Sequence, residues 1–351
     1  MKTIWCRPAT EATSTEIVIG DAPELIGPTR SGSALLLVDQ GFARFHASVV
    51  EAMSAAFFET KIHVVEGGEA TKELSSIATI WDALSRHGID RSGTLIAIGG
   101  GAVLDAASFA AATWHRGISV WLAPTTLTAQ VDAALGGKSA INHRHAKNQI
   151  GLIRQPARLL IDPAWIRSVS DTEYMSGLGE VVKTGLLAGG RLHSLLVNSV
   201  ALIHARDPSV LREIVELCLT YKTSIVEVDP EDRGIRASLN AGHTLGHVIE
   251  SMAIQKGIPV AHGTAVALGL RLESKFLPGY DSESVRSLLD AFGFPNELPF
   301  VIGQDEAVAV LMKDKKREGR ALRLPIIESP GSVSYHAIRP EQIAAAFVLG
   351  S

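Results

Sequence analysis

The sequence predicts a parallel-sheet α/β domain followed by a mainly α-helical domain. Two observations support this: β-rich runs alternate with helical runs in the first half of the chain, and helical periodicity dominates from about Ser170 onward. We expect the first domain to span residues 1–168 and the second to span residues 169–351.

In the first half, short apolar runs rich in β-branched residues are predicted to be buried strands, separated by amphipathic helices. The predicted strands are Ala34–Val38, Lys61–Val65, Thr94–Ile98 and Ser119–Leu122. The predicted helices are Ala43–Glu59, Glu73–Arg86 and Val103–His115. This β-α-β alternation is typical of a parallel sheet with helices on its faces.

The second half shows mostly helical periodicity, and a strand-like run returns only at Leu322–Ile327. Its predicted helices are Tyr174–Leu187, Leu192–His204, Pro208–Val228, Leu245–Met252, Ala265–Phe276, Ser282–Phe292 and Asp305–Lys313. We expect the domains to join near Pro163–Ser170 and a ligand site to lie in the cleft between them.

The composition excludes several classes of protein. Lys and Arg total 33 against 37 Asp and Glu, so the net charge of −4 argues against a nucleic-acid binder. Two cysteines, Cys6 and Cys218, are too few for a disulfide scaffold. Because no long apolar run appears and the N-terminus lacks a secretory signal, we expect no membrane contact and a cytoplasmic location.

A glycine run, Gly99-Gly100-Gly101, joins a predicted strand to a predicted helix. Glycine lets backbone N–H groups approach a phosphate, and a helix N-terminus favours anions. The run matches neither G-x-G-x-x-G nor the Walker pattern, so a nucleotide loop and a simple tight turn both remain open. Asp39, at the end of an earlier strand, is either a ribose ligand or a helix cap.

The segment Pro124–Asn148 gathers hydroxyls, an acid, paired glycines and two lysines, and it is predicted to be a long polar loop. Its alternatives are a plain surface loop and a functional loop. Lys138 follows Gly136-Gly137 and is therefore able to reach a bound anion with little steric obstruction.

Three histidines, His243, His247 and His262, fall within twenty positions. Glu180 and Lys183 lie upstream at i,i+3 among apolar residues, either as a surface ion pair or as a partly buried one. Two histidines and one glutamate with an open position suit a catalytic zinc ion. Spacing alone leaves open whether His243 and His247 both bind the metal, or whether only one of them does so together with His262.

Lys222, Arg236 and Asn240 lie near that cluster in the sequence, either as solvated residues or as part of the site. Together with Lys138, Lys147 and Lys183 they make a site with many cations. An anionic substrate that carries phosphate or carboxylate is the expected partner.

These motifs resemble those of the 3-dehydroquinate synthase family, the NAD- and zinc-dependent sugar-phosphate cyclases of the shikimate pathway. The resemblance covers about Val65 to Ile327. It is carried by GGGAVLDAASFAAATWHRG, PTTLTAQVDAALGGKSAINHRHAKNQIG, GLGEVVKTG, KTSIVEVDPEDRGIRASLNAGHTLGH, HGTAVALG and DKKREG. Several independent motifs in one order are more specific than any one of them.

The resemblance implies a Rossmann-like NAD-binding first domain and a second domain that binds metal and substrate. It implies that Glu180, His243 and His262 bind Zn²⁺ or Co²⁺, and that His247 instead binds substrate or handles a proton. The residues that it assigns to the anionic sugar phosphate are Asp132, Lys138, Asn148, Lys183, Lys222, Arg236 and Asn240.

The resemblance also implies the remaining contacts. Arg116 reaches into a neighbouring subunit's site, which makes the protein a homodimer, and Lys315 or Lys316 closes over the phosphate. The residues implied for NAD are Asp39, Glu69, Lys72, Gly100, Gly101, Ala102, Val103, Asp105, Thr125, Thr126, Lys138, Lys147, Trp165 and Ser168.

The implied activity is the cyclisation of 3-deoxy-D-arabino-heptulosonate 7-phosphate to 3-dehydroquinate with phosphate elimination, with NAD recycled in each turnover. Departures from the family pattern indicate a divergent member: Gly179 replaces Ala, Thr264 replaces Glu, and Ile153-Arg154 replaces Phe-Tyr. The alternatives are an amino-dehydroquinate or other cyclitol synthase of secondary metabolism, a metal-dependent polyol or glycerol-phosphate dehydrogenase, and a non-catalytic sensor.

Overall fold

The computed structural model describes residues 1–8, 14–26, 30–55, 57–144, 146–277, 279–312, 317–318 and 321–349. The chain divides into two compact units. One unit contains Met1–Ser170 and Lys222–Glu231, and the other contains Asp171–Tyr221 and Asp232–Ser351. The helix α9 (Pro208–Val228) therefore contributes residues to both units.

The first unit is built on a sheet of seven described strands in the order β1-β2-β9-β6-β5-β3-β4. β1 pairs antiparallel with β2, and the other neighbouring strands are parallel. The strands are β1 (Lys2–Cys6), β2 (Thr15–Ile19), β3 (Arg30–Asp39), β4 (Phe57–Val65), β5 (Thr94–Gly99), β6 (Ser119–Pro124) and β9 (Arg158–Ile161). The predicted parallel sheet is confirmed.

The order of the parallel strands identifies where a ligand binds in such a sheet. β4-β3-β5-β6-β9 corresponds to the doubly wound order 2-1-3-4-5, which reverses direction between β3 and β5. Ligands of such folds bind just beyond the carboxyl ends of the strands at this point. Here those ends are Asp39 and Gly99.

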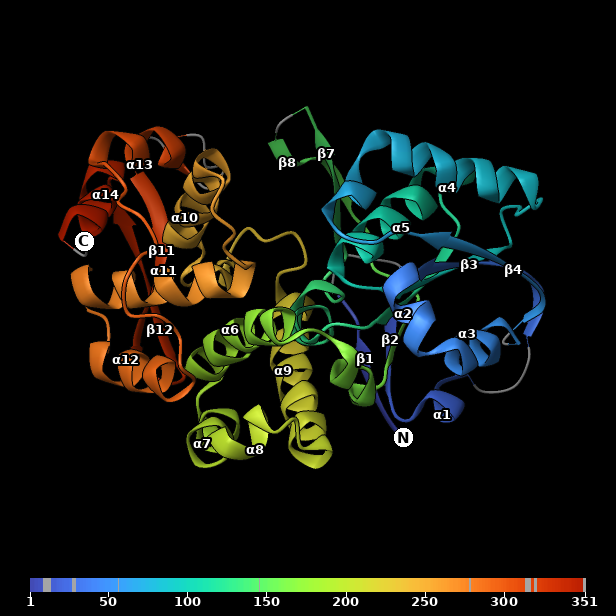
Figure 1. Cartoon of the computed structure of the whole chain (residues 1–351), viewed down its shortest axis with the longest axis horizontal. Helices are drawn as coiled ribbons and strands as arrows, with labels where there is room; N and C mark the ends of the chain where they lie inside the picture. Colours follow the sequence, from blue (N-terminus) through green and yellow to red (C-terminus); the bar gives the residue numbers. More distant parts are fainter. Residues whose placement is uncertain are drawn as a thin grey trace. The chain divides into compact units, whose positions relative to one another are not determined.

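Helices cover both faces of this sheet. In Figure 1, α4 (Leu74–Arg86) and α5 (Gly101–Thr113) lie on one face, and α2 (Gln40–Phe45) and α3 (Ala47–Ser54) lie on the other. Because the central strands are covered on both faces, they appear in the sequence as continuous apolar runs.

The predicted helix Ala43–Glu59 is wrong in part. The structure has two helices that meet at His46, whose backbone (φ −132°, ψ 42°) is not helical. The second helix ends at Ser54, and the strand β4 begins at Phe57. Aromatic and β-branched residues favour a strand there, and pairing with β3 stabilises it.

The segment predicted to be a long polar loop contains regular structure. A π-helical turn, η3 (Ala129–Ala133), is followed by the antiparallel hairpin of β7 (Lys138–His143) and β8 (Ala146–Ile153). Ser139 and Ile141 of β7 are buried, whereas Lys138 is exposed. The polar Ser139 at a buried position obscured this strand pattern in the sequence.

The second unit is mainly helical, as predicted. It contains α6 (Asp171–Ala188), α7 (Gly190–Asn198), α8 (Val200–His204), α10 (His243–Lys256), α11 (His262–Phe276), α12 (Ser282–Ala291), α13 (Gln304–Leu311) and α14 (Pro340–Leu349). The predicted helix Leu192–His204 is divided at Ser199, which is not helical (φ −125°, ψ 17°).

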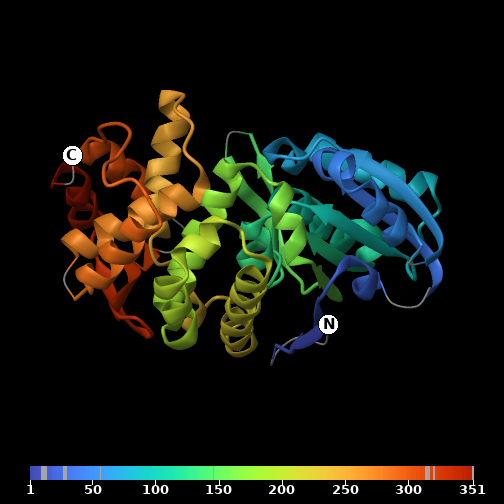
Figure 2. The same ribbon diagram turned by 60° about the horizontal axis from the view of Figure 1, so that its bottom comes forward.

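A small antiparallel sheet completes the second unit. Its strands are β10 (Arg317–Glu318), β11 (Ala321–Ser329) and β12 (Ser332–Ile338). Leu324 and Ile326 of β11 share one buried cluster with Leu245 of α10 and Phe347 of α14. In Figure 2, α14 appears in dark red beside these strands, whereas the N-terminus belongs to the first unit.

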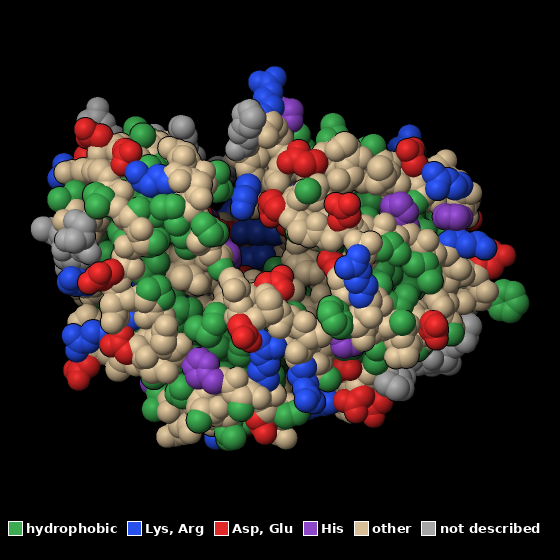
Figure 3. Space-filling view, viewed as in Figure 1, with side chains coloured by type: hydrophobic (Ala, Val, Ile, Leu, Met, Phe, Trp, Pro, Cys, Tyr) green, Lys and Arg blue, Asp and Glu red, His purple; other side chains and the backbone are tan. Residues whose placement is uncertain are grey.

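The surface carries mixed charge. On the face in Figure 3, acidic and basic side chains are interspersed over the outer surface.

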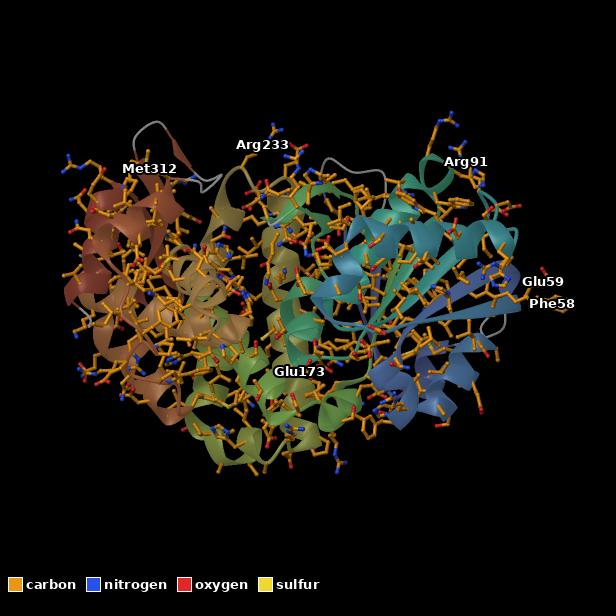
Figure 4. The ribbon with its side chains drawn as sticks, turned by 45° about the horizontal axis from the view of Figure 1, so that its top comes forward. Phe58, Glu59, Arg91, Glu173, Arg233 and Met312 are labelled. Carbon is orange, nitrogen blue, oxygen red and sulfur yellow. The ribbon has the colours of Figure 1, made fainter. Side chains whose placement is uncertain are left out.

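β4 forms one edge of the large sheet, and the side chain of Phe58 at its start points into solvent in Figure 4 and is 86% exposed. No helix in the described part of the chain is long and apolar enough to cross a membrane.

Candidate active site

Two helices of the second unit, α6 and α11, approach closely at a pair of glycines. A Cβ atom on Gly179 would lie 2.2 Å from the carbonyl oxygen of Gly263, and one on Gly263 would lie 1.7 Å from the carbonyl oxygen of Ser176. Neither distance is sterically possible, so this approach requires glycine at both positions. The next residue after Gly179 is Glu180, and the residue before Gly263 is His262, so the close approach brings these two side chains together.

Glu180, His243 and His262 form a compact cluster. The Nε2 atoms of His262 and His243 lie 3.1 and 3.5 Å from Oε1 of Glu180. One possible ligand atom of each residue lies within 4.8 Å of the other two. Two imidazoles and one carboxylate, with a further position left for substrate or water, are the protein ligands of many catalytic zinc sites.

The environment of Glu180 fits a cation. Its side chain is completely buried, and nitrogen atoms of Lys183, His243 and His262 lie within 3.5 Å of its two oxygens. Nζ of Lys183 lies 2.6 Å from Oε2. Burial alone would raise the pKa of Glu180, but Lys183 and the two imidazoles hold that pKa well below its usual range. The cluster therefore contains an ionised carboxylate with lone pairs that a divalent metal can use.

The two histidines of the cluster differ in charge. Burial and the nearby ammonium of Lys183 lower the pKa of His243 well below its usual value. Burial also acts to lower the pKa of His262, but hydrogen bonds with Glu180 and Glu250 raise it to about 10. Both imidazoles must present an unprotonated nitrogen to a metal, so a metal would displace a proton from His262.

His247 lies beside the cluster. Its ring centroid is 5.5 Å from that of His243 and 6.4 Å from that of His262. His247 is exposed, and it is not part of the described group whose ligand atoms lie within 4.8 Å of one another. Of the pairings that the sequence left open, the geometry groups His243 with His262.

Arg236 and Asn240 lie in the short 3-10 helix η5 (Ile235–Asn240), just before α10. Arg236 is 4% exposed, and Nδ2 of Asn240 donates to the carbonyl oxygen of Ala237 at 3.3 Å. A buried guanidinium needs polar or anionic partners. The assignment of both residues to the substrate stays a prediction.

In the first unit, Lys222 and Asp132 form an ion pair. Nζ of Lys222 lies 2.5 Å from Oδ1 and 2.7 Å from the carbonyl oxygen of Asp132. Lys222 is 6% exposed. The family resemblance implies that both residues bind the anionic substrate, and the structure brings them together. An anion that binds Lys222 must therefore compete with, or add to, this carboxylate.

The segments predicted to bind NAD follow four parallel strands. Asp39 ends β3, and Glu69–Lys72, Gly100–Asp105 and Thr125-Thr126 follow β4, β5 and β6. Because the carboxyl ends of parallel strands meet at one edge, these segments lie on one side of the first unit. α5 begins at Gly101 without a side-chain cap, so its first N–H groups suit a bound anion.

Asp39 caps the helix α2. Its Oδ1 accepts hydrogen bonds from the backbone N–H groups of Gly41 (2.8 Å) and Phe42 (3.2 Å). Gly67 packs against the other oxygen, since a Cβ atom there would lie 2.0 Å from Oδ2. The helix-cap alternative is therefore correct, and a contact with ribose stays a prediction.

A polar network links the hairpin to these segments. Lys72, which is 4% exposed, contacts both Asp105 and the side-chain oxygen of Asn148. Nδ2 of Asn142 donates to Glu69 at 2.9 Å, and its Oδ1 accepts from the backbone N–H of Asn148 at 3.1 Å. Burial raises the pKa of Asp105, and the ammonium of Lys72 opposes this rise. Three predicted cofactor residues and one predicted substrate residue thus support one another.

Trp165 and Ser168 lie in the 3-10 helix η4 (Pro163–Ser168). The indole of Trp165 is 2% exposed and packs edge-on against Phe42, with the ring centroids 5.4 Å apart. Oγ of Ser168 lies 2.8 Å from Nε2 of His46. Trp165 is therefore a core residue in this structure, and contact of either residue with NAD stays a prediction.

The remaining predicted residues are peripheral. Lys138 and Lys147 lie at exposed positions of the hairpin. Arg116 is exposed and lies in the turn η2 (Trp114–Arg116), where it has a left-handed backbone (φ 65°) that is uncommon for a non-glycine residue. Lys315 and Lys316 lie outside the described residues.

Two residues near these sites were not anticipated from the sequence. Oε1 of Glu250 lies 3.2 Å from Nδ1 of His262, and Asn142 joins the network of Lys72. Glu250 follows His243 by seven residues, which places both on one face of α10 and is a usable signal. No pattern in the sequence distinguishes Asn142 from other polar strand residues.

Family models match both halves of the chain. The model described as 3-dehydroquinate synthase N-terminal matches residues 62–176, and the one described as 3-dehydroquinate synthase C-terminal matches residues 177–317. The chain belongs to the 3-dehydroquinate synthase family.

Relatives in this family match most of the chain. The 3-dehydroquinate synthase of Desulforamulus reducens is 38% identical over 80% of this chain and 80% of its own length. That of Pyrobaculum islandicum is 40% identical over 81% of this chain and 83% of its own length.

Solved structures agree in fold. A 2-deoxy-scyllo-inosose synthase complexed with carbaglucose-6-phosphate, NAD⁺ and Co²⁺ has a TM-score of 0.85 at 22% identity, covering 100% of both chains. The 2-epi-5-epi-valiolone synthase of Streptomyces hygroscopicus, with NAD⁺ and Zn²⁺ bound, has a TM-score of 0.86 at 21% identity, covering 99% of both. A probable glycerol dehydrogenase from Sinorhizobium meliloti has a TM-score of 0.66 at 17% identity, covering 98% of both chains.

Proposed function

We propose that this protein is a 3-dehydroquinate synthase of the shikimate pathway. It converts 3-deoxy-D-arabino-heptulosonate 7-phosphate into 3-dehydroquinate and phosphate, using NAD and a divalent metal, Zn²⁺ or Co²⁺, in the cytoplasm. The observation that supports this most is the cluster of Glu180, His243 and His262 in a chain of the 3-dehydroquinate synthase family.

The metal would be held by one oxygen of Glu180 and by Nε2 of His243 and His262. When bound, it supplies Lewis acidity to a substrate hydroxyl, and bound NAD supplies reversible removal of a hydride. Lys183 keeps Glu180 ionised, as the lowered pKa of this carboxyl indicates. His247, exposed beside the cluster, would accept and return a proton at an imidazole nitrogen.

Cationic side chains would bind the two anionic ends of the substrate and fix its orientation. Arg236 and Lys222 are nearly buried, so anions reach them with little competition from water. The uncapped N-terminus of α5, with Thr125-Thr126 at the end of β6, would bind the pyrophosphate of NAD. The polar network of Lys72 would hold the hairpin, with Lys138 and Lys147, against this region.

The direct test measures the release of phosphate and the accumulation of NADH. Purified protein with NAD, Co²⁺ and the heptulosonate phosphate should release phosphate without net accumulation of NADH, and a chelator should stop the release. His243→Ala should lose both bound metal and activity, whereas His336→Ala, at an exposed position of β12, should keep both. Stoichiometric accumulation of NADH would instead identify a dehydrogenase.

A related sugar-phosphate cyclase is the second candidate, because cyclases of other products share the fold over nearly the whole chain. A polyol dehydrogenase is more distant in structure. Turnover assays with a panel of heptulose and hexulose phosphates separate the cyclases. The proposed substrate is wrong if a different phosphate is converted with a higher kcat/KM.

The homodimer is part of this proposal. Arg116 would reach the site of a second copy, and its strained left-handed backbone is a feature often found at functional positions. Arg116→Ala and His243→Ala should each be inactive alone. Mixed and allowed to exchange subunits, they should recover about a quarter of the wild-type activity, since half of the copies are then in mixed dimers with one intact site each. No recovery would show that Arg116 acts within its own subunit.

A further inference from the structure

His262 lies between two carboxylates. Its Nε2 faces Oε1 of Glu180 at 3.1 Å, and its Nδ1 faces Oε1 of Glu250 at 3.2 Å. Glu180 belongs to the cluster of possible metal ligands among the described residues, and Glu250 does not. Glu250 therefore contacts His262, a possible metal ligand, without belonging to the cluster itself.

The chemistry of the contact between His262 and Glu250 shows which of the two carries the proton of this hydrogen bond. An ionised carboxylate can only accept a hydrogen bond, so Nδ1 of His262 must be the donor. With Nδ1 committed to Glu250, the ring can offer only Nε2 to a metal. The same logic applies to His243, whose Nδ1 lies 3.2 Å from the carbonyl oxygen of Ala241.

The two partners differ in rigidity and charge. The carbonyl oxygen of Ala241 is fixed by the backbone, and His243 is 9% exposed, so its ring is confined by packing. The side chain of His262 is 37% exposed and lies at the first position of α11. Its ring has less packing to hold it, so its orientation depends more on the hydrogen bond to Glu250.

Glu250 is itself well placed for this task. It lies on α10, seven residues after His243, so one helix carries both a cluster residue and the support for another. Its side chain is 20% exposed, which screens its charge only partly. A second carboxylate near the cluster also increases the attraction for a divalent cation.

We propose that Glu250 is a positioning residue for His262: it accepts the Nδ1 proton, fixes the ring with Nε2 toward Glu180, and strengthens metal binding through its charge. This role rests on the proposed metal site. Hydrogen-bond partners of metal-ligating histidines typically contribute 10- to 100-fold to metal affinity.

Two substitutions separate orientation from charge. Glu250→Ala removes both the hydrogen bond with Nδ1 of His262 and the negative charge. Glu250→Gln loses the charge but keeps an oxygen that can accept that hydrogen bond. Glu173→Gln is the matched control, because Glu173 lies at an exposed position in the first turn of α6. The dissociation constant for Co²⁺ is measured in each protein by competition with a chromophoric chelator, without substrate or NAD.

We expect Glu250→Ala to weaken Co²⁺ binding about 10- to 100-fold, Glu250→Gln to weaken it less, and Glu173→Gln to leave it unchanged. The visible absorption of bound Co²⁺ should shift in Glu250→Ala and be largely restored in Glu250→Gln, which a purely structural role would not produce. Circular dichroism and the Tm of the metal-free proteins verify folding.

The outcomes distinguish this role from the proposed function. Equal Co²⁺ affinity in Glu250→Ala and wild type, with the wild type binding Co²⁺, overturns the role of Glu250 and leaves the metal site intact. A wild-type protein that binds no Co²⁺ overturns the metal site and this role together. Affinity lost equally in the Gln and Ala variants, with no spectral rescue, shows that charge alone acts and overturns the positioning role.

Discussion

At the scale of single residues, the ion pair of Lys183 and Glu180 controls the candidate site. The two side chains are 1% and 0% exposed, with 2.6 Å between Nζ and Oε2. Removing one partner of a buried pair leaves an uncompensated charge and typically costs about 3–5 kcal/mol. We therefore expect Lys183→Met to lower the free energy of unfolding of the metal-free protein by about this amount, as measured in urea.

A bound divalent cation replaces the charge of Lys183, so saturating Co²⁺ should recover much of that loss. Arg191→Met is the control, because its pair with Glu213 is of similar length but is 65% and 38% exposed and is worth about 1 kcal/mol or less. An equal loss in the two variants, or no recovery with Co²⁺, would contradict the view that Lys183 compensates a metal-ligand carboxylate.

At the scale of elements, the approach of α6 and α11 sets the distance between Glu180 and His262. Adding a methyl group at Gly179 would place it 2.2 Å from the carbonyl oxygen of Gly263, which belongs to the backbone and cannot turn aside. We expect Gly179→Ala to move the helices apart, to cost about 1–3 kcal/mol in unfolding free energy, and to weaken Co²⁺ binding.

Gly185→Ala, in the same helix, is the matched control. Its methyl group would lie 2.3 Å from Cδ1 of Leu196, which is the far end of a side chain rather than backbone, and alanine favours a helix over glycine. This variant should bind Co²⁺ like the wild type. Unchanged metal affinity in Gly179→Ala would mean that the helix contact does not determine the site.

At the scale of the whole molecule, local patterns in the sequence identified most elements but not the contacts between them. Helices such as Pro208–Val228 and strands such as Thr94–Ile98 follow from periodicity, because their buried faces repeat regularly. The helix over Ala43–Glu59 and the loop over Pro124–Asn148 were misjudged, because pairing with β3 and the formation of a hairpin are non-local.

The candidate site was likewise predictable from local patterns in its residues but not in the contacts between them. Spacing gave the three histidines and Glu180, but the contact of His262 with Glu180 depends on how α11 crosses α6, which the close contacts of Gly179 and Gly263 accompany. Residues that act through another side chain were missed for the same reason. Glu250 and His262 are twelve positions apart on different helices, and Asn142 and Glu69 are separated by 73 positions.

The affinity of the protein for a metal should rise with pH, because His262 must lose a proton before it can bind the metal. Burial acts to lower the pKa of His262, but its hydrogen bonds with Glu180 and Glu250 raise it to about 10. Below that pH the metal-free protein holds a proton that the metal must displace. Affinity for Co²⁺ should therefore rise about tenfold per pH unit from pH 6.5 to 8.5, with about one proton released per ion.

The same linkage predicts the stability of the metal-free protein. A histidine with a raised pKa stabilises the fold fully below its unfolded pKa of about 6.5, and this contribution is lost as the pH rises toward 10. The metal-loaded protein has already lost that proton, so the stabilisation by Co²⁺ should grow with pH. Urea unfolding with and without Co²⁺ at pH 6.5, 7.5 and 8.5 measures this difference, and a constant difference above pH 7 would show that the pKa of His262 is not raised.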